Sequence, residues 1–144
     1  MSNEPVKPGA KIILVVDDNP IILKATSIAL KSRGYQVSIA LGGPEAIGLV
    51  RKEKPDLILL DLSFPPDPAN IGGPMRDGFL IIEWLRRIPE GEKVPIMIIS
   101  GTKPEEYQSR ALAAGVLACF HKPLKNDELL ASIQTALAKQ AGQS

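Results

Sequence analysis

Short apolar runs alternate with amphipathic stretches from Lys11 to about Lys139. Each run is rich in Val, Ile or Leu, which is typical of β-strands, and the stretches between them carry helix signals. Five strands and five helices in strict alternation predict an α/β fold with a parallel sheet. The predicted strands cover residues 12–16, 36–40, 57–60, 96–99 and 117–120.

The apolar pattern also distinguishes central strands from an edge strand. Three of the predicted strands are apolar throughout, as expected for strands that helices cover on both faces. The run Gln36-Val37-Ser38-Ile39-Ala40 instead alternates polar and apolar residues. This period of two indicates a strand with one wetter side, so we expect it at the edge of the sheet.

Capping residues mark where the helices begin. Asn19-Pro20 combines an N-cap residue with a proline in the first turn, and Ile21, Ala25 and Ile28 then fall on one face before Gly34 stops the helix. The other predicted helices begin at Gly43-Pro44-Glu45, at Phe79, after the capping-box spacing Thr102-Lys103-Pro104-Glu105, and at Asn126-Asp127-Glu128.

Composition adds limits on the class of protein. The chain has 144 residues, 44% of them hydrophobic, and 17 basic against 16 acidic residues give a net charge of +1. Such values predict one globular domain, and no run of Lys and Arg suggests nucleic-acid binding. No apolar run approaches the roughly 20 residues that span a bilayer. Cys119 is the single cysteine, so no intrachain disulfide forms, and a cytoplasmic location is expected.

We predict a domain over residues 11–140 between flexible tails at 1–10 and 141–144, with no separate output domain. One connection is unusually long, at residues 62–76, and it contains four prolines and the pair Gly72-Gly73. Connections of this length are uncommon and are usually functional or disordered. Three interpretations stay open for this loop: a lid, a docking element and a disordered insertion.

Charged side chains follow the predicted strands at one edge. Asp17-Asp18 end the first strand and Asp61 ends the third, and the carboxyl ends of parallel strands share one edge of the sheet. Carboxylates gathered there repel one another and require a positive group. Lys122, after the fifth strand, is one candidate. A hard cation is the other, and oxygen-only ligands favour Mg²⁺.

Mg²⁺ bound by carboxylates suits a phosphoryl group, and Ser100 at the end of the fourth strand adds a hydroxyl donor. Each residue alone has a simpler interpretation. Asp17-Asp18 and Asp61 would be caps, Ser100 a turn residue, and Lys122 a solvated lysine. Their joint arrangement at one edge favours a phosphoryl-transfer site.

The ordered set Asp17-Asp18, Asp61, Ser100-Gly101 and Lys122-Pro123 resembles the receiver domain of two-component response regulators. The resemblance covers almost the whole chain, from about Lys11 to Lys139. It implies a flavodoxin-like, doubly wound (βα)5 fold with strand order 2-1-3-4-5.

The resemblance also implies a role for each site residue. Asp61 would accept the phosphoryl group from a phosphohistidine. Mg²⁺ would be bound by Asp17, Asp18, Asp61 and the backbone carbonyl of Ser63. Ser100 and Lys122 would stabilise the phosphoryl group, Ser63 and Thr102 would tune its lifetime, and the Lys122-Pro123 bond would be cis.

One position departs from the family pattern. Receivers usually carry Tyr or Phe three residues before the lysine, as a ring that moves inward on phosphorylation, and here that position is Cys119. The neighbouring Phe120 has the strand parity of the opposite face. We therefore expect the usual aromatic switch to be absent or altered.

The resulting hypothesis is a stand-alone receiver, a phosphoacceptor and not an enzyme. Its expected partners are a sensor histidine kinase or a histidine phosphotransfer protein and an unknown downstream protein, with no nucleic acid and no membrane insertion. It would be a monomer or a phosphorylation-dependent dimer, and it would signal by protein contact or pass the phosphoryl group onward.

Two rival functions stay open. Cys119 and the long loop also suit a non-switching interaction module with the same fold. A hydrolase of the aspartyl-phosphate type would share the aspartate, lysine and Mg²⁺, but such enzymes carry an acid two residues after the nucleophile, where this chain has Ser63.

Overall fold

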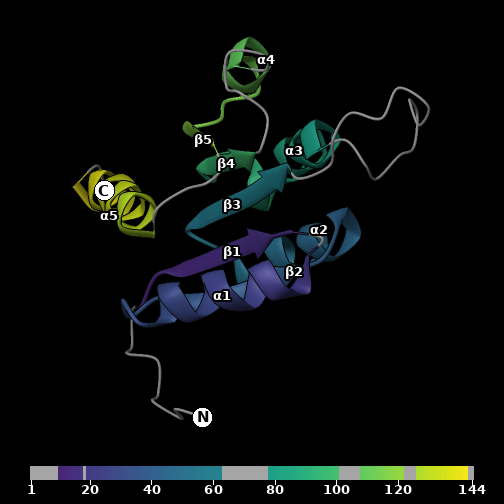
Figure 1. Ribbon diagram of the computed structural model, residues 1–144. Helices are drawn as coiled ribbons and strands as arrows, with labels where there is room; N and C mark the ends of the chain where they lie inside the picture. Colours follow the sequence, from purple (N-terminus) through teal and green to yellow (C-terminus); the bar gives the residue numbers. More distant parts are fainter. Residues whose placement is uncertain (1–9, 18, 63–77, 101–107, 122–125, 143–144) are drawn as a thin grey trace.

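A computed structural model of the chain describes residues 10–17, 19–62, 78–100, 108–121 and 126–142 (Figure 1). Strands and helices alternate along it as predicted. The elements are β1 (Ile12–Val16), α1 (Pro20–Lys31), β2 (Gln36–Ala40), α2 (Gly43–Glu53), β3 (Leu57–Leu62), α3 (Gly78–Arg87), the 3-10 turn η2 (Pro89–Gly91), β4 (Ile96–Ser100), α4 (Gln108–Ala113), β5 (Ala118–His121) and α5 (Asn126–Gly142). None of the helices in these ranges is long and apolar enough to cross a membrane.

The five strands form one parallel sheet in the order β2-β1-β3-β4-β5. This order confirms the predicted doubly wound fold, and it confirms that Gln36–Ala40 is an edge strand. Because all strands run the same way, their carboxyl ends lie along one rim of the sheet. Of the predicted site residues, Asp17, Asp61 and Ser100 lie in the described ranges, and the strand order brings these three to that rim.

Helices cover both faces of the sheet with separate hydrophobic cores. One core joins Leu14, Val16, Leu60 and Ile98 to residues of α2, α3 and α4. The other joins Ile13, Val15 and Leu59 to residues of α1 and α5. Alternate residues of each central strand thus enter opposite cores, which explains why these strands are apolar throughout.

Helix α1 differs from the prediction in the face it buries. The apolar stripe of Ile21, Ala25 and Ile28 points to solvent, and the side chains of Ile21 and Ile28 are 79% and 60% exposed. Leu23 and Leu30, seven residues apart, pack on the sheet instead. The sequence contains two apolar stripes on this helix, and periodicity alone does not show which of them the sheet selects.

Strand boundaries at the rim also differ slightly from the sequence prediction. β3 continues to Leu62 and β4 to Ser100, because Asp61 pairs with Ile99 and Leu62 with Ser100 in the parallel ladder. Asp61 and Ser100 are consequently members of strands rather than residues of the loops that follow. Pairing in the sheet, with β4 for Asp61 and with both β3 and β5 for Ser100, fixes their positions more firmly than a loop would.

Several predictions fall outside the described residues. They are the long connection, the Thr102–Glu105 capping box, and most of the N-terminal tail. At the other end, α5 continues to Gly142 and so includes the first two residues of the segment predicted as a C-terminal tail.

Candidate functional site

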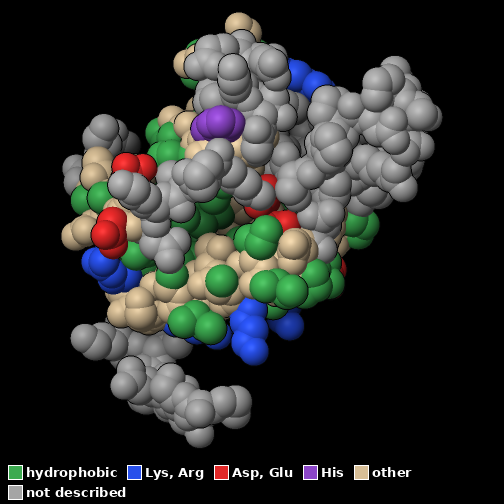
Figure 2. Space-filling view, in the orientation of Figure 1, with side chains coloured by type: hydrophobic (Ala, Val, Ile, Leu, Met, Phe, Trp, Pro, Cys, Tyr) green, Lys and Arg blue, Asp and Glu red, His purple; other side chains and the backbone are tan. Residues whose placement is uncertain are grey.

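Two carboxylates lie side by side where β1 and β3 end. The ladder pairs Val16 with Leu60, so the next residues along the two strands, Asp17 and Asp61, are neighbours. Adjacent strands are about 4.8 Å apart, and by alternation both residues belong to the face of Val15 and Leu59. Figure 2 shows acidic side chains set into a hollow at this rim. The predicted pairing of these two acids is therefore present.

Both carboxylates are withdrawn from water. The exposed fractions are 1% for Asp17 and 5% for Asp61, and Oδ2 of Asp17 and Oδ1 of Asp61 are buried from solvent. Burial of two like charges at this separation is unfavourable unless a positive group accompanies them. The arrangement is therefore typical of a site that binds a cation.

Asn19 holds Asp17 in place and begins the first helix at the same time. Its backbone N–H donates to Oδ1 of Asp17 at 3.0 Å, and its own Oδ1 accepts from the N–H groups of Ile21 at 2.9 Å and Ile22 at 3.4 Å. The sequence predicted only the capping role. The spacing Asp17-x-Asn19 carries the second signal, because an Asp side chain readily accepts from the N–H two residues later.

Ser100 completes the described part of the rim. It is the last residue of β4 and is 1% exposed, and its Cα pairs with those of Leu62 on β3 and His121 on β5. By alternation Ser100 follows Ile96 and Ile98, on the face covered by α2, α3 and α4. The hydroxyl thus reaches the rim from the opposite face to the two carboxylates.

Cys119, at the position of the usual aromatic switch, lies on the face of the sheet that strand alternation predicts. Cys119 is partly buried and packs against the core under α2, α3 and α4, whereas Phe120 packs against the core under α1 and α5. Phe120 therefore does not replace the missing ring on the Ser100 face. His121, the single histidine, is exposed, as expected for a residue at a strand end (Figure 2).

Five other predicted site residues lie outside the described residues: Asp18, Ser63, Thr102, Lys122 and Pro123. Their predicted roles stay predictions. Within the described ranges the structure thus brings together Asp17, Asp61 and Ser100, from three different strands, at one rim.

The donor chemistry of the described residues fits Mg²⁺. Two buried carboxylates supply the hard oxygen ligands that this ion prefers, usually with several waters and a phosphate completing its shell. No group of three or more His, Cys, Asp or Glu side chains suited to a metal occurs within the described ranges. Two protein carboxylates suit Mg²⁺, which keeps several waters, better than they suit a closed structural metal site.

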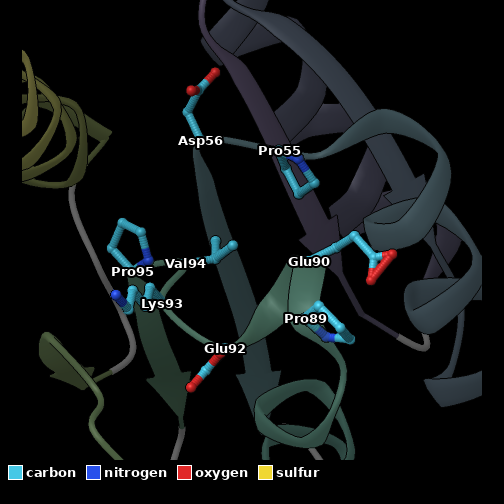
Figure 3. A pocket seen from close by; sticks show the side chains of 8 residues that line it. All are labelled: Pro55, Asp56, Pro89, Glu90, Glu92, Lys93, Val94 and Pro95. Carbon is cyan, nitrogen blue, oxygen red and sulfur yellow. The ribbon is translucent and has the colours of Figure 1, made fainter.

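A pocket of about 460 Å³ lies elsewhere, at the amino edge of the sheet (Figure 3). It is formed where β3 and β4 begin, and its walls include Asp56, Glu90, Glu92 and Lys93. Asp56 is already engaged there, since its Oδ2 accepts from the N–H of Ile12 at 2.8 Å and its Oδ1 lies 4.0 Å from Nζ of Lys11. The pocket is therefore separate from the paired carboxylates at the other edge.

Comparison with known proteins gives a family match. Residues 13–134 match the family described as response regulator receiver domain. The chain is 32% identical over 129 residues to the transcriptional regulatory protein KdpE of Mycobacterium tuberculosis, which covers 89% of this chain but 51% of KdpE. The chain thus spans about half the length of that relative.

Solved structures agree in fold. A CheY-like receiver domain protein from Methanospirillum hungatei is 26% identical and superposes with a TM-score of 0.80, covering 94% of this chain and 100% of the other. The receiver domain of a sensor histidine kinase from Pseudomonas aeruginosa is also 26% identical, with a TM-score of 0.73 and coverage of 90% and 99%. That structure has a magnesium ion coordinated in its active site cleft.

Proposed function

Because this chain belongs to the response regulator receiver domain family, we propose that it accepts a phosphoryl group on Asp61 from the phosphohistidine of a histidine kinase or phosphotransfer protein, in a Mg²⁺-dependent reaction. The observation that carries the proposal is the pair of buried carboxylates, Asp17 and Asp61, at the carboxyl rim of the sheet.

In the proposed reaction, an oxygen of the Asp61 carboxylate attacks the phosphorus of the phosphohistidine. A P–O bond forms, the P–N bond breaks, and the imidazole leaves with the electron pair and takes up a proton. The carboxylate oxygen is itself the nucleophile, so the step needs no general base. The pairing of Asp61 with Ile99 on β4 restricts its movement and so favours an in-line approach.

The surrounding residues stabilise the charge that moves onto Asp61. Bound Mg²⁺ would neutralise the phosphoryl oxygens, and Asp17 and Asp61 would hold it, together with Asp18 and the carbonyl of Ser63. Ser100 would donate its hydroxyl to a phosphoryl oxygen, and Lys122, before the proposed cis bond to Pro123, would pair with the acyl phosphate.

A surface beside the rim suits docking of the phosphodonor. The exposed apolar stripe of α1 begins at Ile21, four residues after Asp17, and continues through Ile28. An exposed apolar helix face next to a reactive group fits a helical partner that brings its histidine to that group. We propose this stripe as the contact with the phosphodonor, in the cytoplasm where histidine kinases present their phosphohistidine.

The output is proposed to be a change in contacts with another protein or onward phosphoryl transfer. Ser63 and Thr102 would set how long the phosphoryl group persists. The specific observation in favour of a second function is Cys119, which packs against the core where a ring is expected. A non-switching interaction module with this fold would bind its partner equally well before and after phosphorylation. Family membership favours a phosphoacceptor over the hydrolase alternative.

The phosphoacceptor proposal is tested by incubation with acetyl phosphate and Mg²⁺, followed by intact-protein mass spectrometry. The unmodified sequence and Asp56→Asn should gain one phosphoryl group, and Asp61→Asn should gain none. Asp56→Asn is the matched control, because it makes the same chemical change at the other edge of the sheet. A gain of mass by Asp61→Asn equal to that of the unmodified sequence would overturn the assignment.

The docking surface requires a second comparison. Ile21→Lys should slow phosphoryl transfer from a histidine kinase without changing transfer from acetyl phosphate, since the small donor makes no contact with the stripe. Leu112→Lys on α4, where the side chain is 64% exposed, is the control. Equal kinase-dependent rates for both variants would remove the stripe from the proposal. Partner binding that is unchanged by Asp61→Asn and by phosphorylation would favour the non-switching module.

A further inference from the structure

Arg86, near the end of α3, is a polar centre that the proposed chemistry does not use. Its guanidinium group is half-buried and donates five hydrogen bonds, all of them to backbone carbonyls. Nη1 donates to Gly91 at 3.1 Å, to Glu92 at 3.3 Å and to Val94 at 2.6 Å. Nε donates to Ala114 at 3.4 Å, and Nη2 to Gly115 at 3.1 Å.

These carbonyls belong to two segments that are distant in sequence. Three of them, of Gly91, Glu92 and Val94, lie from the last residue of η2 to just before β4, and Glu92 and Val94 also line the pocket of Figure 3. The other two, of Ala114 and Gly115, directly follow the last residue of α4. Arg86 therefore joins three elements at the amino edge of the sheet: α3, the entry to β4, and the turn from α4 into β5.

The contact with α4 is made just beyond the end of the helix. The carbonyls of residues 110–112 already accept from the N–H groups of residues 114–116, so Arg86 binds the next carbonyls along the chain. A cation at this end also interacts favourably with the helix dipole. The chain reverses at Gly115, whose φ of +77° is in the left-handed region, so the carbonyls of residues 114 and 115 turn toward α3. A guanidinium group offers donors in a planar fork, and Lys has no equivalent.

Helix α4 depends on such an anchor. Within its described residues, Gln108–Ala113, only Ala111 is buried, so the hydrophobic core holds this part of the helix weakly. Leu112 is 64% exposed, and Leu117, just before β5, is 52% exposed. Arg86 also has no acidic partner within 4.0 Å in the described part of the chain, and burial lowers the pKa of its guanidinium group. Its hydrogen-bond partners among the described residues are backbone carbonyls, and these five contacts fix the position of the guanidinium group.

We propose that Arg86 is the hinge of α4: it holds the C-terminal end of the helix against α3 and β4, so that a rearrangement begun at Ser100 moves the N-terminal end. This inference rests on the proposed function, since phosphorylation of Asp61 supplies the rearrangement. Anchoring one end converts a small shift at the rim into a rotation of the helix. The exposed Leu112 and Leu117 then change their relative position on the surface that a partner would contact.

The test is amide hydrogen exchange along α4 and β5, measured before and after phosphorylation by acetyl phosphate and Mg²⁺. Arg86→Lys keeps the positive charge but loses the fork, and Arg87→Lys, at the exposed neighbouring residue, is the matched control. Before phosphorylation, we expect the amides of residues 114–116 to exchange about tenfold faster in Arg86→Lys than in the control.

Phosphorylation should add a response that a purely structural role would not. In the control, the change in exchange should be confined to the first residues of α4, 108–110. In Arg86→Lys it should extend through residues 114–116, because the hinge no longer restrains that end. A second variant, Gly115→Ala, disturbs the same contact from the acceptor side and should reproduce this pattern if Arg86→Lys is too unstable to measure.

The outcomes separate the hinge from the proposed function. Identical exchange in Arg86→Lys and Arg87→Lys, both before and after phosphorylation, overturns the hinge. If Asp61 gains no phosphoryl group in the unmodified sequence, the proposed function fails, and the hinge fails with it as a regulatory device. Phosphorylation that alters residues 114–116 as strongly as residues 108–110 in the control also overturns it, because an anchored end would not respond.

Discussion

Removing one charge from the paired acids should stabilise the fold in the absence of Mg²⁺. The perturbation is Asp61→Asn, which keeps the shape of the side chain and removes its charge. Asp17 stays on the adjacent strand, 1% exposed and held by the N–H of Asn19. Because the two carboxylates repel each other only when both are folded into the rim, the substitution relieves a cost that the unfolded chain does not bear.

The magnitude follows from the strand spacing. Two unit charges about 5 Å apart repel by about 3 kcal/mol at the effective dielectric constant of about 20 that describes protein sites. Lys122, in its proposed role, would offset part of this repulsion. We therefore expect Asp61→Asn to raise the free energy of unfolding by about 1–3 kcal/mol in a chelating buffer, and to gain less from added Mg²⁺ than the unmodified sequence does.

The assay is urea unfolding followed by circular dichroism, with EDTA and then with Mg²⁺. Asp56→Asn is the control, and here the sign should reverse. Asp56 accepts from the N–H of Ile12 at 2.8 Å, so loss of its charge should lower the free energy of unfolding by about 1 kcal/mol. Two results would refute repulsion between Asp17 and Asp61 as the dominant effect at this rim. One is a lower free energy of unfolding for Asp61→Asn in EDTA, and the other is an equal stabilisation by Mg²⁺ of Asp61→Asn and the unmodified sequence.

Three further substitutions test local features by the same unfolding assay. Asn19→Ala removes the cap of α1 and should cost about 1–2 kcal/mol; an unchanged midpoint would contradict the capping role. Lys54→Gly should gain up to about 1 kcal/mol, since Lys54 ends α2 with a left-handed φ of 51°, and a loss would refute this reasoning. Gly91→Ala should destabilise, because a Cβ there would clash with the carbonyl oxygen of Leu85; a neutral result would show that the turn yields easily.

Much of the fold was predictable, because the spacing of the apolar residues distinguishes helices, central strands and the edge strand. Strands that lie in the middle of the sheet are apolar on both faces, and the alternation in Gln36–Ala40 identified the edge. The burial of α1 was not predictable in the same way. Its two stripes, one with Leu23 and Leu30 and the other with Ile21 and Ile28, are equally apolar, and only packing on the sheet distinguishes them.

The candidate site was predictable as far as strand ends determine it. Asp17, Asp61 and Ser100 each end or follow a strand, and parallel strands bring such residues to one rim. Arg86 could not be identified in this way, because its five acceptors are backbone carbonyls. Every residue has such a carbonyl, so the residue types in a sequence do not show which carbonyls will accept a hydrogen bond. The second role of Asn19 was visible only as a two-residue spacing from Asp17.

The central claim is that Asp61 carries the phosphoryl group, and the most direct measurement locates that group on the chain. After incubation with acetyl phosphate, reduction with borohydride converts a phosphorylated aspartate to homoserine, which peptide mass spectrometry assigns to one position. We expect homoserine at residue 61 when Mg²⁺ is present and none when EDTA replaces it. Homoserine at another aspartate, or equal labelling of residue 61 in EDTA, would contradict it.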